Sequence, residues 1–172
     1  MVEKLAYKVR EKVDDVELRR YGETYLATVE GLSDQEAFRA LFRYISGRNG
    51  QGREITMTSP VISFGEGIPM VSPVLPTGNG MSFIIPSDYS WEEIPRPTES
   101  GIRIERLPER TMAVLGFRGR VEGENVGKMK EKLLRTLRSE GIRARGEVIL
   151  MRYGPPYMPG VLRRNEVAVQ VV

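Results

Sequence analysis

Two kinds of side chain that often carry chemistry, histidine and cysteine, do not occur anywhere in the 172 residues. Catalysis by Ser-His-Asp or Cys-His groups, imidazole or thiolate metal sites and disulfides are therefore excluded. Acid–base chemistry would depend on Asp, Glu, Tyr or Lys, and none of these stands in a recognisable catalytic spacing. We predict a binding protein that is not an enzyme and has no metal ligands.

The most informative spacing occurs on a helix predicted over residues 34–46. Ser33 and Glu36 have the form of a capping box at its start, and Gly47 is placed to end it. At about 100° per residue its apolar side chains cover an arc of about 200°, whereas a helix on one core needs little more than ~100°. The helix predicted over residues 124–140 has a narrower arc of about 140°. The first helix therefore has apolar side chains to spare.

Phe38 and Phe42 lie at one rim of the wide arc, and Arg39 and Arg43 stand beside them on the polar side. An apolar rim flanked by guanidinium groups suits a flat, hydrophobic ligand that carries carboxylates, because Arg pairs with a carboxylate through two hydrogen bonds. The alternative is that a loop or strand covers Phe38 and Phe42, since aromatic residues at helical spacing are usually core.

A second candidate wall of the site is the loop over residues 154–164, GPPYMPGVLRR. It places Met158 and Leu162 on a frame stiffened by proline, and it is too apolar for an idle surface loop. Its alternative role is to cover the core.

Strands are predicted around these segments from the alternation of apolar and polar side chains. The predicted strands cover Leu5–Val13, Val16–Tyr21, Thr24–Glu30, Glu54–Met57 closed by Pro60, Val61–Phe64, Met81–Ile85, Ile102–Leu107, Glu147–Tyr153 and Glu166–Val171, with a short piece at Ile68–Val71.

The order strand–strand–helix–strand–strand occurs twice, over about residues 16–86 and 102–172 of one domain that spans residues 1–172. We predict an α+β fold in which the two units form a distorted antiparallel β-barrel flanked by both helices. The alternative to duplication is chance resemblance between alternating strands.

The charge of the chain is modestly basic, with a net charge of +3 and a pI near 9.3. Dense basic residues without interleaved aromatic residues do not indicate a nucleic-acid surface. There is no apolar run long enough to cross a membrane and no apolar leader at the N-terminus. We expect a cytoplasmic monomer that binds neither nucleic acid nor membrane.

Three segments, in this order, resemble the SOUL/haem-binding protein family. They are AFRALFRYISGRN…ITMTSPV within residues 37–61, FIIPSDYSWEEIPRPTES at residues 83–100, and RRNEV at residues 163–167. The resemblance implies the duplicated strand–helix barrel and non-covalent binding of haem or another tetrapyrrole in a shallow apolar cleft. It implies a carrier or buffer rather than a catalyst.

Carried over to this chain, the resemblance makes the following residues candidates for the site. The cleft wall would be Phe38, Leu41, Phe42 and Ile45; the propionate partners would be Arg39, Arg43 and Arg48; and the loop side would hold Met158 and Leu162. Some family members are thought to ligate the iron through histidine, which this chain lacks. Tyr44 or Met158 is the alternative ligand, or the iron has none.

Two other functions stay open at this level. One is a small-molecule effector-binding domain of the related gyrase-inhibitor-like fold, where a cationic ligand would need an inward carboxylate from Glu54, Glu147 or Glu166. The other is a protein-interaction module without a small ligand.

Overall fold

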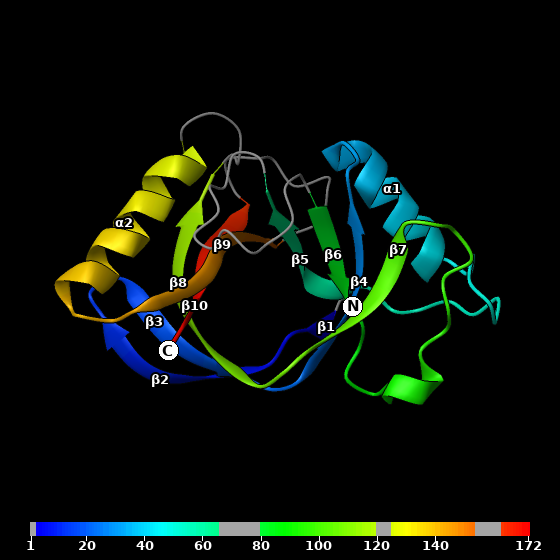
Figure 1. Ribbon diagram of the computed structural model, residues 1–172, viewed down its shortest axis with the longest axis horizontal. Coiled ribbons are helices and arrows are strands. Elements are labelled where there is room, and N and C mark those ends of the chain that lie inside the picture. Colours follow the sequence, from blue (N-terminus) through cyan, green and yellow to red (C-terminus); the bar gives the residue numbers. More distant parts are fainter. Residues whose placement is uncertain (1–2, 66–79, 120–124, 154–162) are drawn as a thin grey trace.

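The computed structural model describes residues 3–65, 80–119, 125–153 and 163–172, and Figure 1 shows their arrangement. The elements in chain order are β1 (Glu3–Lys4), β2 (Tyr7–Val13), β3 (Val16–Tyr21), β4 (Thr24–Glu30), α1 (Asp34–Ile45), β5 (Thr58–Phe64), β6 (Gly80–Ile84), the short 3-10 helix η1 (Trp91–Glu93), β7 (Ile102–Leu107), β8 (Arg110–Arg118), α2 (Asn125–Ser139), β9 (Ala144–Arg152) and β10 (Arg164–Val171).

The strands form one sheet in the order β2-β3-β8-β10-β9-β5-β6-β4-β7, and β1 pairs in parallel with β5. Every other pair is antiparallel. The predicted α+β class and antiparallel sheet are confirmed. The sheet is barrel-like but not closed, because β2 and β7 stand at its two ends in the part of the chain that the structure describes.

The sheet consists of two parts, each with its own helix, and the two parts are joined where β9 pairs with β5. We call β4, β5, β6, β7 and α1 the α1 half, and β2, β3, β8, β9, β10 and α2 the α2 half. Figure 1 shows the two helices at opposite ends of the molecule, on the outside of the curled sheet. The predicted duplication stays a prediction.

Three clusters of buried side chains make up the core. One lies under α1, a second lies under α2, and the third contains side chains from both halves on the sheet face away from the helices, here called the inner face. Strand alternation explains this division. On β8, Ala113 and Leu115 belong to the cluster under α2, whereas Met112 and Val114 belong to the inner cluster. Side chains of one strand thus serve two separate layers.

The start of α1 confirms the Ser33 half of the predicted capping box, since the Ser33 hydroxyl accepts a hydrogen bond from the backbone N–H of Glu36 at 3.2 Å. The Glu36 carboxylate accepts from the Ser33 hydroxyl at 3.1 Å instead of from its backbone N–H. The predicted strand at Glu54–Met57 is wrong. The strand begins at Thr58 instead and continues through Pro60. Pairing with β6 shifts between Thr58 and Ile62, and in this irregular stretch the missing N–H of proline interrupts no regular ladder.

The predicted short strand at Ile68–Val71 lies outside the described residues. Within the described ranges, none of the helices combines the length and the apolar character needed to cross a membrane.

Candidate functional site

A partly exposed aromatic pair lies on α1. Phe42 is 50% exposed, and its ring stacks on that of Phe38 with 6.0 Å between ring centroids and an interplanar angle of 15°. Phe38 is half-buried and packs edge-on against Phe83 of β6 at 5.3 Å. The core under α1 therefore holds Phe38 in place, and Phe38 in turn supports Phe42 at the surface. We call Phe38 and Phe42, with the arginines beside them, the α1 rim.

The three arginines predicted for this site differ in their partners. Arg43 donates two hydrogen bonds to Glu99, at 2.7 and 3.1 Å, and this contact lowers the pKa of the Glu99 carboxyl. Arg39 and Arg48 are exposed and form no ion pair with another described residue. Arg39 lies one turn before Arg43 on the same helix, so the rim keeps a guanidinium group available to an anionic ligand.

Two residues predicted for the cleft wall are buried instead. Leu41 is 0% exposed and Ile45 is 6% exposed, and both belong to the core under α1. The resemblance carried them into the site because they share the apolar arc with Phe42, but they face the sheet. Met158 and Leu162 lie outside the described residues.

A cavity of about 340 Å³ lies in the α2 half, away from the predicted tetrapyrrole site, and its lining includes Glu166, which the sequence analysis considered only for a cationic ligand. It is bounded by the β2–β3 hairpin, β8, β10 and the first turns of α2. Its lining consists of Lys12, Asp15, Glu17, Arg19, Val114, Leu115, Gly116, Met129, Lys132, Arg164 and Glu166. Seven of these eleven residues are charged, so the cavity offers little apolar surface to a flat hydrophobic ring. We call it the α2 cavity.

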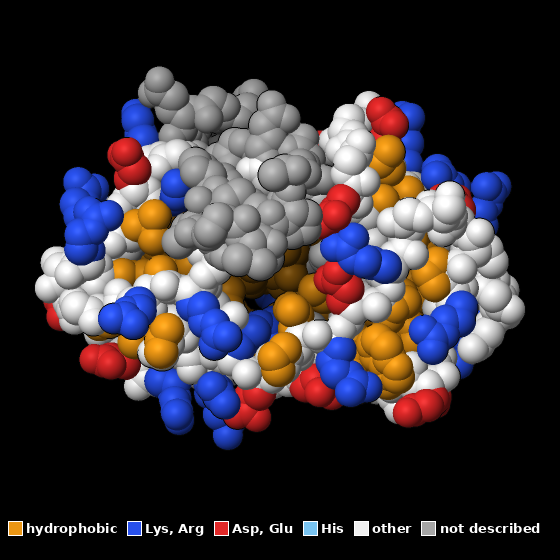
Figure 2. All heavy atoms as spheres, viewed as in Figure 1, with side chains coloured by type: hydrophobic (Ala, Val, Ile, Leu, Met, Phe, Trp, Pro, Cys, Tyr) orange, Lys and Arg blue, Asp and Glu red, His pale blue; other side chains and the backbone are white. Residues whose placement is uncertain are grey.

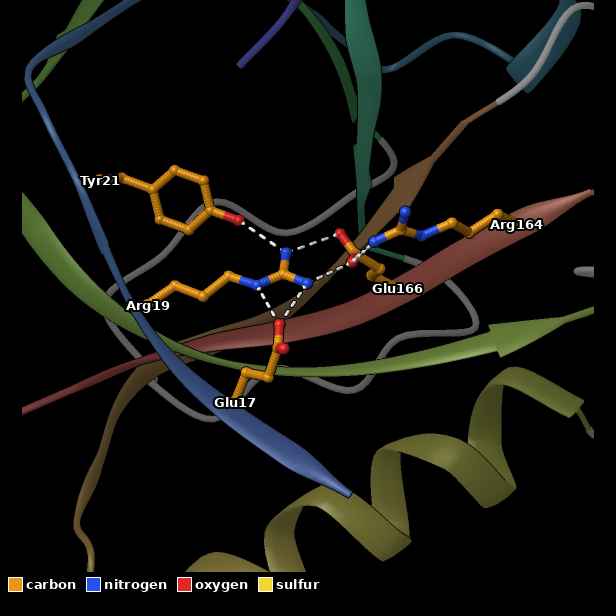
Figure 3. Close-up of polar contacts among 5 residues, drawn as sticks. All are labelled: Glu17, Arg19, Tyr21, Arg164 and Glu166. Atoms are coloured by element: carbon orange, nitrogen blue, oxygen red, sulfur yellow. Dashed lines mark hydrogen bonds and ion pairs between the residues drawn. The ribbon is translucent and has the colours of Figure 1, made fainter. Parts of the chain in front are cut away.

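Charged side chains from β3 and β10 meet at this cavity (Figure 3). Arg19 donates to both carboxylate oxygens of Glu166, through Nη1 at 3.1 Å and Nη2 at 2.7 Å. It also donates from Nε to Glu17 at 2.8 Å and from Nη1 to the Tyr21 hydroxyl at 3.0 Å. Arg164 donates to Glu166 at 3.0 Å. The Arg19 and Glu166 side chains are only 4% and 0% exposed, so this is a buried ion pair.

The contacts keep Glu166 ionised although it is buried. Burial alone would raise the pKa of Glu166, but hydrogen bonds from Arg19 and Tyr153 outweigh it, and the pKa lies below its ordinary value. Burial and the negative charge of Glu166 raise the pKa of the Tyr153 hydroxyl. The guanidinium of Arg19 also lies over the ring of Tyr7, 4.0 Å from the centroid.

The sequence contains one signal for this network. Glu17, Arg19 and Tyr21 stand at every second position of a predicted strand, so all three share one face of it. The contact between Arg19 and Glu166 joins residues 147 positions apart in the chain, and it forms because the sheet order places β3 and β10 on either side of β8.

The family model described as "SOUL heme-binding protein" matches residues 2–170. This chain belongs to the SOUL family. The mouse protein named heme-binding protein 2 is 33% identical to this SOUL protein over 146 residues, which cover 79% of this chain and 70% of the mouse protein.

Solved structures share the fold at low sequence identity. The C-terminal domain of EcmrR matches with a TM-score of 0.66 and 10% identity, over 98% of this chain and 99% of that domain. A protein from Listeria innocua named a hydrolase matches with a TM-score of 0.61 and 12% identity, over 94% of each chain. At this identity the likeness is one of fold alone. The family shown here is one of binding proteins.

The three carboxylates that a cationic ligand could use differ in this SOUL protein. Glu54 is exposed, and Glu166 is occupied by Arg19. Glu147 of β9 is half-buried, and its buried Oε2 accepts no hydrogen bond from the described residues. Burial, with a smaller contribution from Glu30, raises the pKa of Glu147.

Proposed function

We propose that this SOUL protein binds haem or a related tetrapyrrole without covalent attachment, on the α1 rim. The observation that supports this most is the half-exposed Phe42, stacked on a Phe38 that the core holds in place. In the view of Figure 2, hydrophobic side chains reach the surface around α1 with Lys and Arg side chains among them. Family membership supports the class of ligand.

The residues of the rim fit such a ligand by their chemistry. One ring face would pack on Phe42 and the exposed part of Phe38, while Arg39 and Arg48 would pair with the propionates. Arg43 would join them only by giving up Glu99, so we assign it a smaller share. The proposed site thus keeps five of the nine candidates and sets aside the buried Leu41 and Ile45.

Binding would depend on apolar contact and on charge pairing. Burying about 300 Å² of apolar surface at ~25 cal/mol/Å² gives roughly 7 kcal/mol before the costs of association. Tyr44 is buried, and its hydroxyl donates to the carbonyl of Pro95 at 2.6 Å, so it is committed to the fold. Without a ligand to the iron, hemin and metal-free protoporphyrin should bind with similar, micromolar or weaker affinity. Weak binding of this kind suits a cytoplasmic, monomeric carrier or buffer.

The test is a titration of the protein with hemin and with protoporphyrin, followed by the Soret band and by porphyrin fluorescence. We expect saturable binding of both, weakened about tenfold or more by Phe42→Glu because a charge would replace the apolar contact. Val9→Glu is the matched control, since Val9 is also 50% exposed but lies on β2. Absence of binding, or equal weakening by the two substitutions, would contradict the proposal.

A second candidate is a hydrophobic cation bound on the inner face, and the observation that favours it is the Oε2 atom of Glu147, which has no hydrogen-bond partner among the described residues. A cation would restore the interaction that this carboxylate lacks. Titration with a fluorescent lipophilic cation such as rhodamine 6G should then show binding that Glu147→Gln abolishes. Binding unaffected by Glu147→Gln would remove this candidate.

A further inference from the structure

The α2 cavity is separate from the proposed tetrapyrrole site, since its lining comes from the α2 half and the α1 rim contributes no residue. Its volume of about 340 Å³ lies at the small end of the range of about 300–1,000 Å³ for ligand pockets. The cavity therefore has the size for a small molecule and a lining suited to a polar one.

The carboxylates of the lining already have cationic partners. Glu166 is bound by Arg19 and Arg164, and Glu17 is bound by Arg19 at 2.8 Å. Asp15 accepts a hydrogen bond from Lys132 at 3.0 Å. A cationic ligand would have to displace one of these partners, which makes a cation a poor match for the cavity.

The buried guanidinium of Arg19 is also fully engaged. Its five N–H groups are directed to Glu17 from Nε and Nη2, to Tyr21 from Nη1, and to Glu166 from both terminal nitrogens. This network is fixed before any ligand arrives, and Arg19 has no donor left for a ligand. A ligand must be held by the cations nearer the surface.

Those cations do have capacity left. Lys12 is exposed and forms no ion pair with another described residue. Lys132 uses one of its three donors on Asp15, whose side chain is 71% exposed, and a pair this exposed costs little to exchange. Arg164 is 48% exposed and donates to Glu166 from one nitrogen only. The lining thus holds four cations against three carboxylates, and this surplus positive charge favours an anion.

The net charge of the whole α2 half also favours an anionic ligand. Residues 22–109, which include the α1 half, hold 7 Lys and Arg against 12 Asp and Glu. The remaining residues hold 19 Lys and Arg against 11 Asp and Glu, a net charge of +8. Lys and Arg side chains are prominent along the α2 side of Figure 2. The field of this half concentrates small anions near the cavity.

We propose that the α2 cavity is a second ligand site, for a small anion that carries phosphate or carboxylate groups and is held by Lys12, Lys132 and Arg164. Met129, Val114 and Leu115 supply a small apolar wall. The buried Arg19–Glu166 pair forms the rigid floor.

The test uses the full chain, ¹⁵N-labelled, with pyrophosphate as the phosphate probe and citrate as the carboxylate probe. We expect saturable shifts of the backbone amides of Leu115, Gly116 and Met129, with millimolar or tighter affinity. Whichever probe binds more tightly identifies the source of the anionic groups. If neither probe shifts these amides, the proposal is wrong.

Two double substitutions separate a site from a general charge effect. Lys12→Gln with Lys132→Gln should weaken binding about tenfold, because both cations face the cavity. Arg135→Gln with Arg138→Gln removes the same charge from exposed positions of α2 and should change the affinity by less than about twofold. Equal weakening by both pairs, or shifts spread along all of α2, would show an adventitious ion only. Tetrapyrrole binding should be unaffected, so the two proposals fail independently.

Discussion

Each half combines one helix with the same kind of antiparallel sheet, but the side chains that cover the inner face differ between the two halves. Gly80 of β6 lies opposite Glu30 of β4, and Glu166 of β10 lies opposite Gly116 of β8. The α1 half covers its glycine with the ring of Phe64. The α2 half places a carboxylate beside its glycine and binds it to Arg19. One half is therefore closed by an aromatic ring and the other by a buried ion pair.

This difference indicates where each half can bind a ligand and which kind of ligand suits it. In the α1 half the ring of Phe64 occupies the space over Gly80 on the inner face, and the unusual feature is the outer aromatic pair on α1. In the α2 half the helix has no exposed large hydrophobic side chain, and the cavity opens beside the ion pair. An apolar ligand thus suits the first half, and a polar ligand suits the second.

The largest effect expected of removing a charge comes from breaking the buried ion pair. Glu166→Gln should lower the free energy of unfolding by about 3 kcal/mol, because it leaves the buried charge of Arg19 without its carboxylate. Glu99→Gln, which removes the half-exposed pair with Arg43, should cost less than about 1 kcal/mol. Urea denaturation measures both. Costs of equal size would mean that the two ion pairs do not differ as described.

The glycines on the two inner faces should also respond differently. A Cβ at Gly80 would collide with the ring of Phe64, so Gly80→Ala should destabilise the protein by about 1–3 kcal/mol. At Gly116 the nearest atom would be the Asn165 carbonyl oxygen at 3.9 Å, so Gly116→Ala should change stability by less than about 0.5 kcal/mol.

Thermal unfolding measures both alanine variants, and Phe64→Leu should relieve part of the cost of Gly80→Ala. A tolerated Gly80→Ala would show that the ring does not close the α1 half.

Acid should act on the α2 half through Glu166. Its pKa is depressed in the folded state, so the carboxylate contributes stability above its unfolded pKa of about 4.3 and loses it as the pH falls through the folded value. Between neutral pH and pH about 3, the wild type should lose more unfolding free energy than Glu166→Gln. Identical losses, measured by urea denaturation at each pH, would contradict the assigned ionisation.

The smallest effect is expected at the α1 rim. Phe42→Ala should change the free energy of unfolding by less than about 0.5 kcal/mol, since half of the side chain is exposed. Leu41→Ala, at the preceding position, should lower the free energy of unfolding by about 2–5 kcal/mol, because that side chain is fully buried. Chemical denaturation would test this contrast. Similar costs would mean that Phe42 is part of the core.

Local patterns predicted most of the fold. Alternation located β3, β4 and β7, and the capping box located the start of α1. Pro60 misled the prediction because its place inside β5 depends on an irregular pairing with β6, which no local signal encodes.

The site was harder to predict because a wide apolar arc does not say which of its residues face the sheet. Leu41 and Phe42 are neighbours in the chain, yet one is fully buried and the other is half exposed. The Arg19–Glu166 pair depends on the order in which β3, β8 and β10 assemble. Strand patterns leave that order open.

The most direct test of the proposed division between the halves is to map protoporphyrin on the ¹⁵N-labelled protein by NMR. Ring-current shifts should be largest at the backbone amides around Phe38 and Phe42, and small at Gly116 and Met129 beside the α2 cavity. The largest shifts at Gly116 and Met129 would contradict the account, because the tetrapyrrole would then occupy the polar half.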